Sequence, residues 1–153
     1  MPQDPEVLAD LATVLLARGR AAEAVTLYQG VIARRPGDLD ALRDLAGARA
    51  AAGDLPGAIR ALESVVRQAP DRADAWLELA RARLEHGDAA GASDAARTAI
   101  ERGDRSDAEG PIVLGQALAA SGDREGARGA FEEALRRRPG SARATEGLRA
   151  LDE

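Results

Sequence analysis

Acidic side chains are the residues of this sequence whose type and spacing could do chemistry. Three pairs of carboxylates stand four residues apart: Glu6 and Asp10, Asp40 and Asp44, and Asp74 and Glu78. On a helix, residues four apart lie on one face. Two neighbouring carboxylates attract a cation, such as the Arg or Lys of a partner. The alternative role is structural, because acids in a first helical turn face the positive end of the helix dipole.

Residues for nucleophilic or acid–base catalysis are scarce. The sequence has no Cys and no Lys, and His86 is its only histidine. It contains no HExxH motif, no Walker loop, no GxGxxG fingerprint and no nucleophile elbow. His86 precedes Gly87, and an imidazole suits the last turn of a helix. We therefore expect no enzyme activity, no catalytic residue, no metal and no cofactor.

Composition and charge narrow the class of protein further. The 153 residues include 36 Ala and 18 Leu, and 26 acidic residues outnumber 21 basic residues, all Arg, for a net charge of −5. A negative chain is a poor general binder of phosphate backbones, and no apolar run approaches the roughly 20 residues of a membrane span. We expect no nucleic-acid partner and no direct membrane insertion. Arg without Lys suggests a bacterial, GC-rich genome, and we expect a cytoplasmic protein, with the periplasm as the alternative.

Four columns of residues repeat along the chain at spacings of 34, 34 and 35. One column is Gly19, Gly53, Gly87 and Gly122, and a second is Ala24, Ala58, Ala92 and Ala127. The others are Leu11, Leu45, Leu79 and Leu114, and Pro36, Pro70 and Pro139, with Asp104 where a proline is missing. The shared spacing predicts one structural unit repeated four times.

Each unit predicts two helices. Asp38 can cap a first helix, Gly53 can end it in a left-handed conformation, and Asp54 can cap a second helix. The role of Asp54 recurs at Asp88 and Asp123. Helices that alternate with glycine-containing turns are thus predicted for most of the chain.

Two features depart from a plain pattern of helix pairs. Gly57, Gly91 and Gly126 share one column early in the second helices, where a glycine costs up to about 1 kcal/mol relative to alanine. Either they permit close backbone contact or these helices begin loosely. Asp104 and the pair Gly110-Pro111 are expected to disturb the junction between the third and fourth units.

The recurring residues resemble those of the tetratricopeptide repeat (TPR). The third unit carries the pattern most clearly, with Trp76, Leu79, Ala80, Gly87 and Ala92. The resemblance implies an all-α fold, a right-handed α-solenoid of stacked antiparallel helix pairs. It predicts a single TPR domain over 1–153, with repeats at about 5–38, 39–72, 73–107 and 108–141 and a C-terminal capping helix over 142–151.

In TPR folds the first helices line a concave groove, and the resemblance implies a peptide-binding site there. The site residues that it implies are Asp10, Thr13, Leu16, Asp40, Arg43, Asp44, Asp74, Leu77, Glu78, Arg81, Leu84, Glu85 and Gln116. With the first-turn acids Glu6 and Glu109, the groove positions hold eight carboxylates and two arginines. We therefore expect the chain's acidity to be concentrated in the groove.

This groove predicts a protein or peptide partner that carries Arg or Lys. Its expected apolar anchors are Leu16, Leu77, Leu84, Ile112 and Val113. Arg43 and Arg81 could pair with an acid of the ligand or with Asp44 and Glu78 beside them, and we expect the second. Chaperone-binding TPRs hold a peptide C-terminus with a clamp of Lys and Asn, and this sequence has neither residue type, which argues against that role.

The leading interpretation is a non-catalytic protein–protein interaction scaffold or adaptor. The alternatives are a self-assembling TPR module, which would form a homo-oligomer, and a regulatory or assembly segment of a larger bacterial protein or envelope complex. The final helix bears on self-assembly. If Leu148 and Leu151 face inward and Arg143, Glu146 and Arg149 face outward, that helix caps the repeats.

Overall fold

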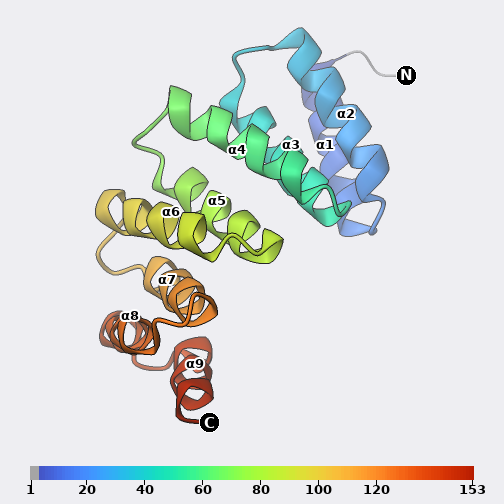
Figure 1. Cartoon of the computed structure of the whole chain (residues 1–153). Helices are drawn as coiled ribbons and strands as arrows, with labels where there is room; N and C mark the ends of the chain where they lie inside the picture. Colours follow the sequence, from blue (N-terminus) through green and yellow to red (C-terminus); the bar gives the residue numbers. More distant parts are fainter. Residues whose placement is uncertain (1–3) are drawn as a thin grey trace. The chain divides into compact units, whose positions relative to one another are not determined.

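The computed structural model describes residues 4–153, which contain nine helices and no strand (Figure 1). In chain order they are α1 (Pro5–Ala17), α2 (Ala21–Arg34), α3 (Leu39–Ala51), α4 (Leu55–Gln68), α5 (Ala73–His86), α6 (Ala89–Arg102), α7 (Glu109–Ala120), α8 (Arg124–Arg137) and α9 (Ala142–Asp152). The chain divides into two compact units, Met1–Gln68 and Ala69–Glu153, called unit 1 and unit 2 below. A single domain over 1–153 stays a prediction, and its residues 1–3 lie outside the described part.

Unit 1 is a pair of helix pairs. α1 packs against α2, α3 packs against both α2 and α4, and α1 also touches α3. Small and large side chains alternate in the core, where Ala12 and Ala24 are fully buried beside Leu8, Tyr28 and Leu45. Alanine at the closest contacts lets the helix axes approach toward the ~8 Å end of the usual range. The abundant alanine of the sequence is therefore core material here.

Unit 2 continues the pattern with five helices. α5 packs on α6, α6 on α7, α7 on α8, and α9 closes against both α8 and α7. Phe131 of α8 is buried, and Leu151 of α9 is 7% exposed beside it in the same core. Arg143, Glu146 and Arg149 lie on the more exposed side of α9. The inward and outward faces predicted for this helix are confirmed.

Glycines with positive φ end the first helix of every pair. Gly19, Gly53, Gly87 and Gly122 have φ between 74° and 91°. The residue after each of them donates its N–H to a carbonyl five positions earlier, at 2.9 Å in all four cases. This hydrogen bond closes a Schellman turn, which needs a left-handed residue at that position. The predicted helix ends are confirmed.

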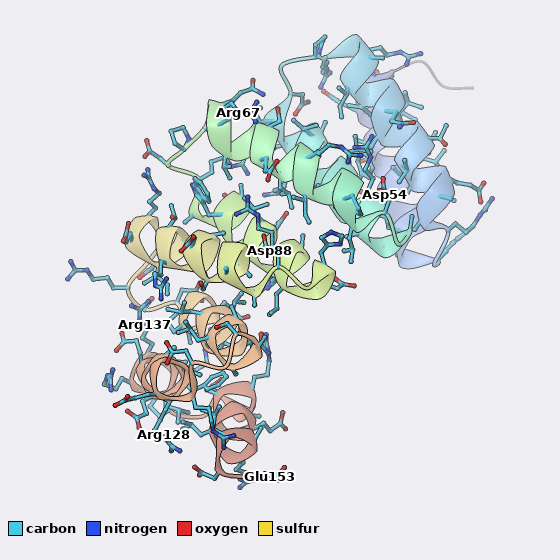
Figure 2. The ribbon with its side chains drawn as sticks, viewed as in Figure 1. Asp54, Arg67, Asp88, Arg128, Arg137 and Glu153 are labelled. Atoms are coloured by element: carbon cyan, nitrogen blue, oxygen red, sulfur yellow. The ribbon has the colours of Figure 1, made fainter. Side chains whose placement is uncertain are left out.

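Aspartates cap the helices that the sequence assigned to them. Asp38 accepts from the N–H of Ala41 at 2.9 Å, and Asp54 accepts from the N–H of Gly57 at 2.9 Å. Asp88 and Asp123 make the same 2.9 Å bond in unit 2 (Asp54 and Asp88 in Figure 2). Each cap satisfies a backbone donor that the helix itself leaves without a partner.

The glycine column at the start of the second helices belongs to these caps. A Cβ on Gly57 would lie 1.9 Å from Oδ2 of Asp54, and the equivalent distances at Gly91 and Gly126 are 2.1 and 2.3 Å. The capping carboxylate folds over the glycine and occupies the place of its side chain. The structure thus favours a close contact, but the contact is with the cap and not with another helix backbone.

The junction between the third and fourth helix pairs is altered only locally. Asp104 accepts from both the N–H and the hydroxyl of Ser106 at 2.8 Å and closes the turn that a proline closes elsewhere. Pro111 is the third residue of α7, where a backbone N–H would have no partner in the helix. Gly110 lies against Ile100, whose Cγ1 would be 2.7 Å from an added Cβ. The predicted disturbance therefore leaves α7 intact.

Candidate functional site

One of the predicted site residues of unit 1, Thr13, contacts a buried hydroxyl. Thr13 of α1 is within 3.0 Å of the hydroxyl of Tyr28, and its own hydroxyl donates to the carbonyl of Ala9 at 3.0 Å. Tyr28 comes from α2 and is 2% exposed. Burial raises the pKa of Tyr28, and the charges of Asp44 and Asp10 raise it further, against the hydrogen bond from Thr13. Asp10 of α1 and Asp44 of α3 therefore act on the same point.

Arginines partly neutralise this face of unit 1. Arg43 pairs with Asp44 at 3.4 Å, as predicted, and the Asp44 side chain stays 40% exposed. Arg35, which follows α2, reaches Glu6 at 3.3 Å. Asp10 is exposed on α1. Arg35 and Arg43 thus partly neutralise Glu6 and Asp44.

Unit 2 arranges the equivalent positions differently. Arg72, the residue before α5, binds Asp74 through two nitrogens at 3.2 and 2.7 Å. Arg81 binds Glu109 of α7 at 2.7 Å. The expected pairing of Arg81 with Glu78 is therefore wrong in its partner, since Arg81 reaches the next first helix instead of its own neighbour.

Glu109 is the centre of an arginine cluster. Arg143 of α9 contacts it at 2.7 Å and Arg138 at 3.7 Å, in addition to Arg81. Burial acts to raise the pKa of Glu109, but hydrogen bonds and charges from Arg143 and Arg81 outweigh it, so the net pKa is lowered. The carboxylate joins three elements of unit 2. It is a structural link and adds no net negative charge to the surface.

Several arginine partners of the groove carboxylates were not visible in the sequence. Sequence reasoning counted only the arginines on groove positions and missed those that enter from the ends of helices: Arg35, Arg72, Arg138 and Arg143. In unit 2 Arg72 contacts Asp74, while Arg81, Arg138 and Arg143 all contact Glu109. In unit 1 Arg35 contacts Glu6 and Arg43 contacts Asp44. A signal did exist, because Arg35, Arg72 and Arg138 each stand beside the proline that ends a repeat or shortly after it.

Two of the predicted apolar anchors are in the core. Ile112 is 1% exposed and Val113 is fully buried, so neither can contact a ligand. The reason is that α7 is covered on several sides by α5, α6, α8 and α9. Leu16, Leu77 and Leu84 are half-buried and keep part of their surface. Leu77 borders a cavity of about 220 Å³ that Ile100 and Pro111 also line.

The remaining predicted site residues lie apart from the residues described above. Glu85 is exposed near the end of α5, and Gln116 is half-buried in α7. His86 is exposed in the last turn of α5. Among residues 4–153 no three His, Asp or Glu side chains are grouped as a metal site would require. The longest described helices have 14 residues, and none of them is long and apolar enough to span a bilayer.

Two family models, each described as Tetratricopeptide repeat, match most of the sequence. The first matches residues 15–71 and 49–110, and the second matches residues 112–148. The chain belongs to the tetratricopeptide repeat family. Its all-α helix pairs are accordingly those of a TPR solenoid, as the recurring residues indicated. Comparison with curated proteins gives no match.

Solved structures share this TPR fold at low sequence identity. MamA from Desulfovibrio magneticus RS-1 is 18% identical, with a TM-score of 0.87, over 97% of this chain and 83% of that chain. TTC0263, a TPR protein of Thermus thermophilus, is 21% identical, with a TM-score of 0.76, over 97% and 81%. The second TPR domain of human RPAP3, in complex with the HSP70 peptide SGPTIEEVD, is 21% identical, with a TM-score of 0.70, over 73% and 92%.

Proposed function

We propose that this TPR chain is a non-catalytic interaction module that binds a basic segment of a partner protein on the first-helix face of unit 1. The observation that carries the proposal is the exposure of two carboxylates on the first helices of unit 1, since Asp10 is exposed on α1 and the Asp44 side chain is 40% exposed on α3. The carboxylates of Asp10 and Asp44 and the hydroxyl of exposed Thr13 offer acceptors to a guanidinium or an ammonium group. These groups suit the binding of a cation.

Charged and apolar contacts would contribute differently to binding. Exposed carboxylates mainly raise the encounter rate and select the sign of the ligand. Affinity comes mostly from a few well-packed apolar or aromatic side chains. Leu16 of unit 1 is half-buried and keeps part of its apolar surface accessible at a predicted position. The partner segment is therefore expected to combine Arg or Lys with an aliphatic or aromatic residue.

The human RPAP3 domain supports peptide binding by this fold but not the same ligand. Its peptide, SGPTIEEVD, ends in acidic residues. On unit 1 of this chain an acidic peptide would meet Asp10 and Asp44, and the sequence has no Lys or Asn for a carboxylate clamp. The proposed ligand therefore has the opposite charge. A bacterial source, a cytoplasmic location and membership of a larger assembly remain proposals beside it.

Selection from a random peptide library displayed on phage tests the proposal without a known partner. We expect peptides enriched on the whole chain to carry a net positive charge and at least one large apolar residue. The chain with Asp10→Arg and Asp44→Arg should fail to retain them. A matched chain with Glu101→Arg and Glu125→Arg changes the same number of exposed charges on second helices and should retain them.

The outcome that would overturn the proposal is equally concrete. Enriched peptides that are neutral or acidic would contradict the charge selection. Basic peptides that the Asp10→Arg and Asp44→Arg chain retains as well as the unchanged chain would contradict the location on unit 1.

A further inference from the structure

Three large apolar side chains are exposed together on α1. Val7, Leu11 and Val14 are 47%, 39% and 46% exposed. Their spacing of four and three residues places them on one face of the helix, called the α1 stripe below. Leu11 also borders a hollow of about 350 Å³ whose walls include Leu15 and Leu27. The stripe is therefore an apolar surface with a depression beside it.

The equivalent residues of the next repeat show what normally packs on this face of a first helix. One repeat later the same three columns hold Ala41, Leu45 and Ala48 of α3, which are 6%, 4% and 0% exposed. These residues belong to the core of unit 1, where α2 packs against α3. This face of a first helix thus normally accepts another helix. In α1 it is exposed, and valines replace the alanines that suffice inside the chain.

Charge along α1 favours a second copy of the same helix in antiparallel orientation. Asp4 caps the N-terminal end, and Arg18 follows the last residue of the helix; both side chains are exposed. Each lies seven residues from Leu11. If two α1 helices pair antiparallel about Leu11, Asp4 of each copy comes level with Arg18 of the other, so opposite charges flank the apolar stripe at both ends.

The other end of the repeat array does not offer a matching surface. The more exposed side of α9 carries Arg143, Glu146 and Arg149, which leaves little apolar area for the α1 stripe to bury. Head-to-tail stacking of copies is therefore disfavoured, and a closed pair with the same patch on both partners remains.

We propose that two copies of the chain associate through the α1 stripe, antiparallel about a two-fold axis near Leu11. This surface is made of other residues than Asp10, Asp44 and the hydroxyls of the candidate peptide site, so the pair would present two such sites. Because only three large side chains are buried from each copy, the pair should dissociate on dilution.

Sedimentation equilibrium of the full chain over about 1–200 µM measures this association. We expect a monomer–dimer equilibrium whose dissociation constant rises at least roughly tenfold in Leu11→Glu, since a carboxylate would be buried at the axis. Ala22→Glu adds the same charge at an exposed site of α2 and should leave the equilibrium unchanged. A monomer throughout the range, or equal effects of the two variants, overturns the proposal.

Single cysteines test the antiparallel arrangement, because the chain has none of its own. Leu11→Cys should form an intermolecular disulfide under mild oxidation, since the two positions meet near the axis. In Arg18→Cys the two thiols would be about 20 Å apart, at a rise of 1.5 Å per residue. We expect a covalent dimer only from Leu11→Cys. Equal cross-linking of both variants would contradict the antiparallel pair.

Discussion

The hydroxyl of Tyr28 joins two helices of unit 1 and is influenced by charge on a third. Thr13 bonds to it from α1, and the charges of Asp10 and Asp44 reach it from α1 and α3. Tyr28 is the only tyrosine, and the chain has no Lys or Cys. Because arginine stays charged to above pH 12, no other side chain titrates between about pH 9 and 12. Alkaline pH therefore isolates this one group.

Stability should fall above about pH 10 because of Tyr28 alone. Burial first, and then the two carboxylates, raise its pKa in the folded state. A raised pKa contributes stability below the unfolded value, near 10, and that contribution is lost as the pH rises through the folded value. Urea unfolding at about pH 9 to 11.5 measures the loss. In Tyr28→Phe the pH dependence should vanish, and an equal decline in both chains would contradict this account.

Glu109 should make the free energy of unfolding depend on pH at the acidic end of the range. Its pKa is lowered on balance, because Arg143 and Arg81 outweigh the effect of burial. The stability that it contributes is present above its ordinary pKa, near 4.3, and is lost as the pH falls through the lowered value. Glu109→Gln should cost about 1–3 kcal/mol of unfolding free energy at pH 7.

Two comparisons keep this prediction specific. The difference between the unchanged chain and Glu109→Gln should shrink when both are unfolded below about pH 4. Glu85→Gln, at an exposed carboxylate on a predicted groove position, should cost less than about 0.5 kcal/mol. If the cost of Glu109→Gln stayed constant down to about pH 2.5, the arginine cluster would not be its cause.

At the scale of single residues, sequence reasoning succeeded where a role depends on local spacing. The caps at Asp38 and Asp54 and the turn at Gly53 need only their own neighbours in the chain, and each was predictable. The partner of Arg81 was not, because Glu109 is 28 residues away and becomes a neighbour only through packing.

The second helices begin in one of two ways, with a capping aspartate or with an ion pair. In the second, third and fourth pairs an aspartate caps the second helix and folds over a glycine three residues later. In the first pair those two positions hold Arg20 and Glu23, which form an ion pair at 2.6 Å instead. The choice of glycine at that position thus depends on the residue that caps the helix, a dependence that propensity alone does not predict.

Phe131 explains two other glycines inside helices. A Cβ on Gly115 of α7 would lie 2.7 Å from the nearest ring atom of Phe131, and a Cβ on Gly147 of α9 would lie 2.5 Å from one. The aromatic ring therefore contacts the backbones of two helices, one on each side of α8 in sequence. This contact fixes how α9 closes unit 2.

Alanine substitutions at two glycines should have opposite signs. Gly115→Ala should lower the unfolding free energy by about 1–3 kcal/mol, because the buried Phe131 ring must move. Gly129→Ala, in α8 with nothing within 4 Å of the added Cβ, should raise it by about 0.5–1 kcal/mol through helix propensity. Urea unfolding of both variants measures the difference. A stabilising effect at Gly115 would contradict the close contact.

For whole elements, the repeat spacing predicted the order of helices and their ends closely. Which residues of each helix stay exposed was harder to predict. Ile112 and Val113 occupy groove positions by register, yet α9 and the neighbouring pairs bury them in the core. The repeat register gives the position of a residue on its own helix, but it does not tell how many other helices pack against that position.

Across the whole molecule, charge is distributed less evenly than the sequence suggested. The net charge of −5 was expected to lie along all the first helices. Unit 1 carries nine acidic residues and eight arginines, whereas unit 2 carries seventeen and thirteen, so most of the net charge lies on unit 2. The proposed dependence of a basic ligand on Asp10 and Asp44 rests on their exposure, since Asp10 is exposed and the Asp44 side chain is 40% exposed.

Fluorescence anisotropy with one labelled basic peptide from the library selection measures this dependence most directly. The chain with Asp10→Asn and Asp44→Asn should bind it roughly three- to tenfold more weakly, because each exposed charge contributes about 0.2–1 kcal/mol. Glu101→Gln with Glu125→Gln is the matched control and should change the dissociation constant less than about twofold. Urea unfolding confirms that each variant is folded. Equal binding by all three chains would contradict the acidic site on unit 1.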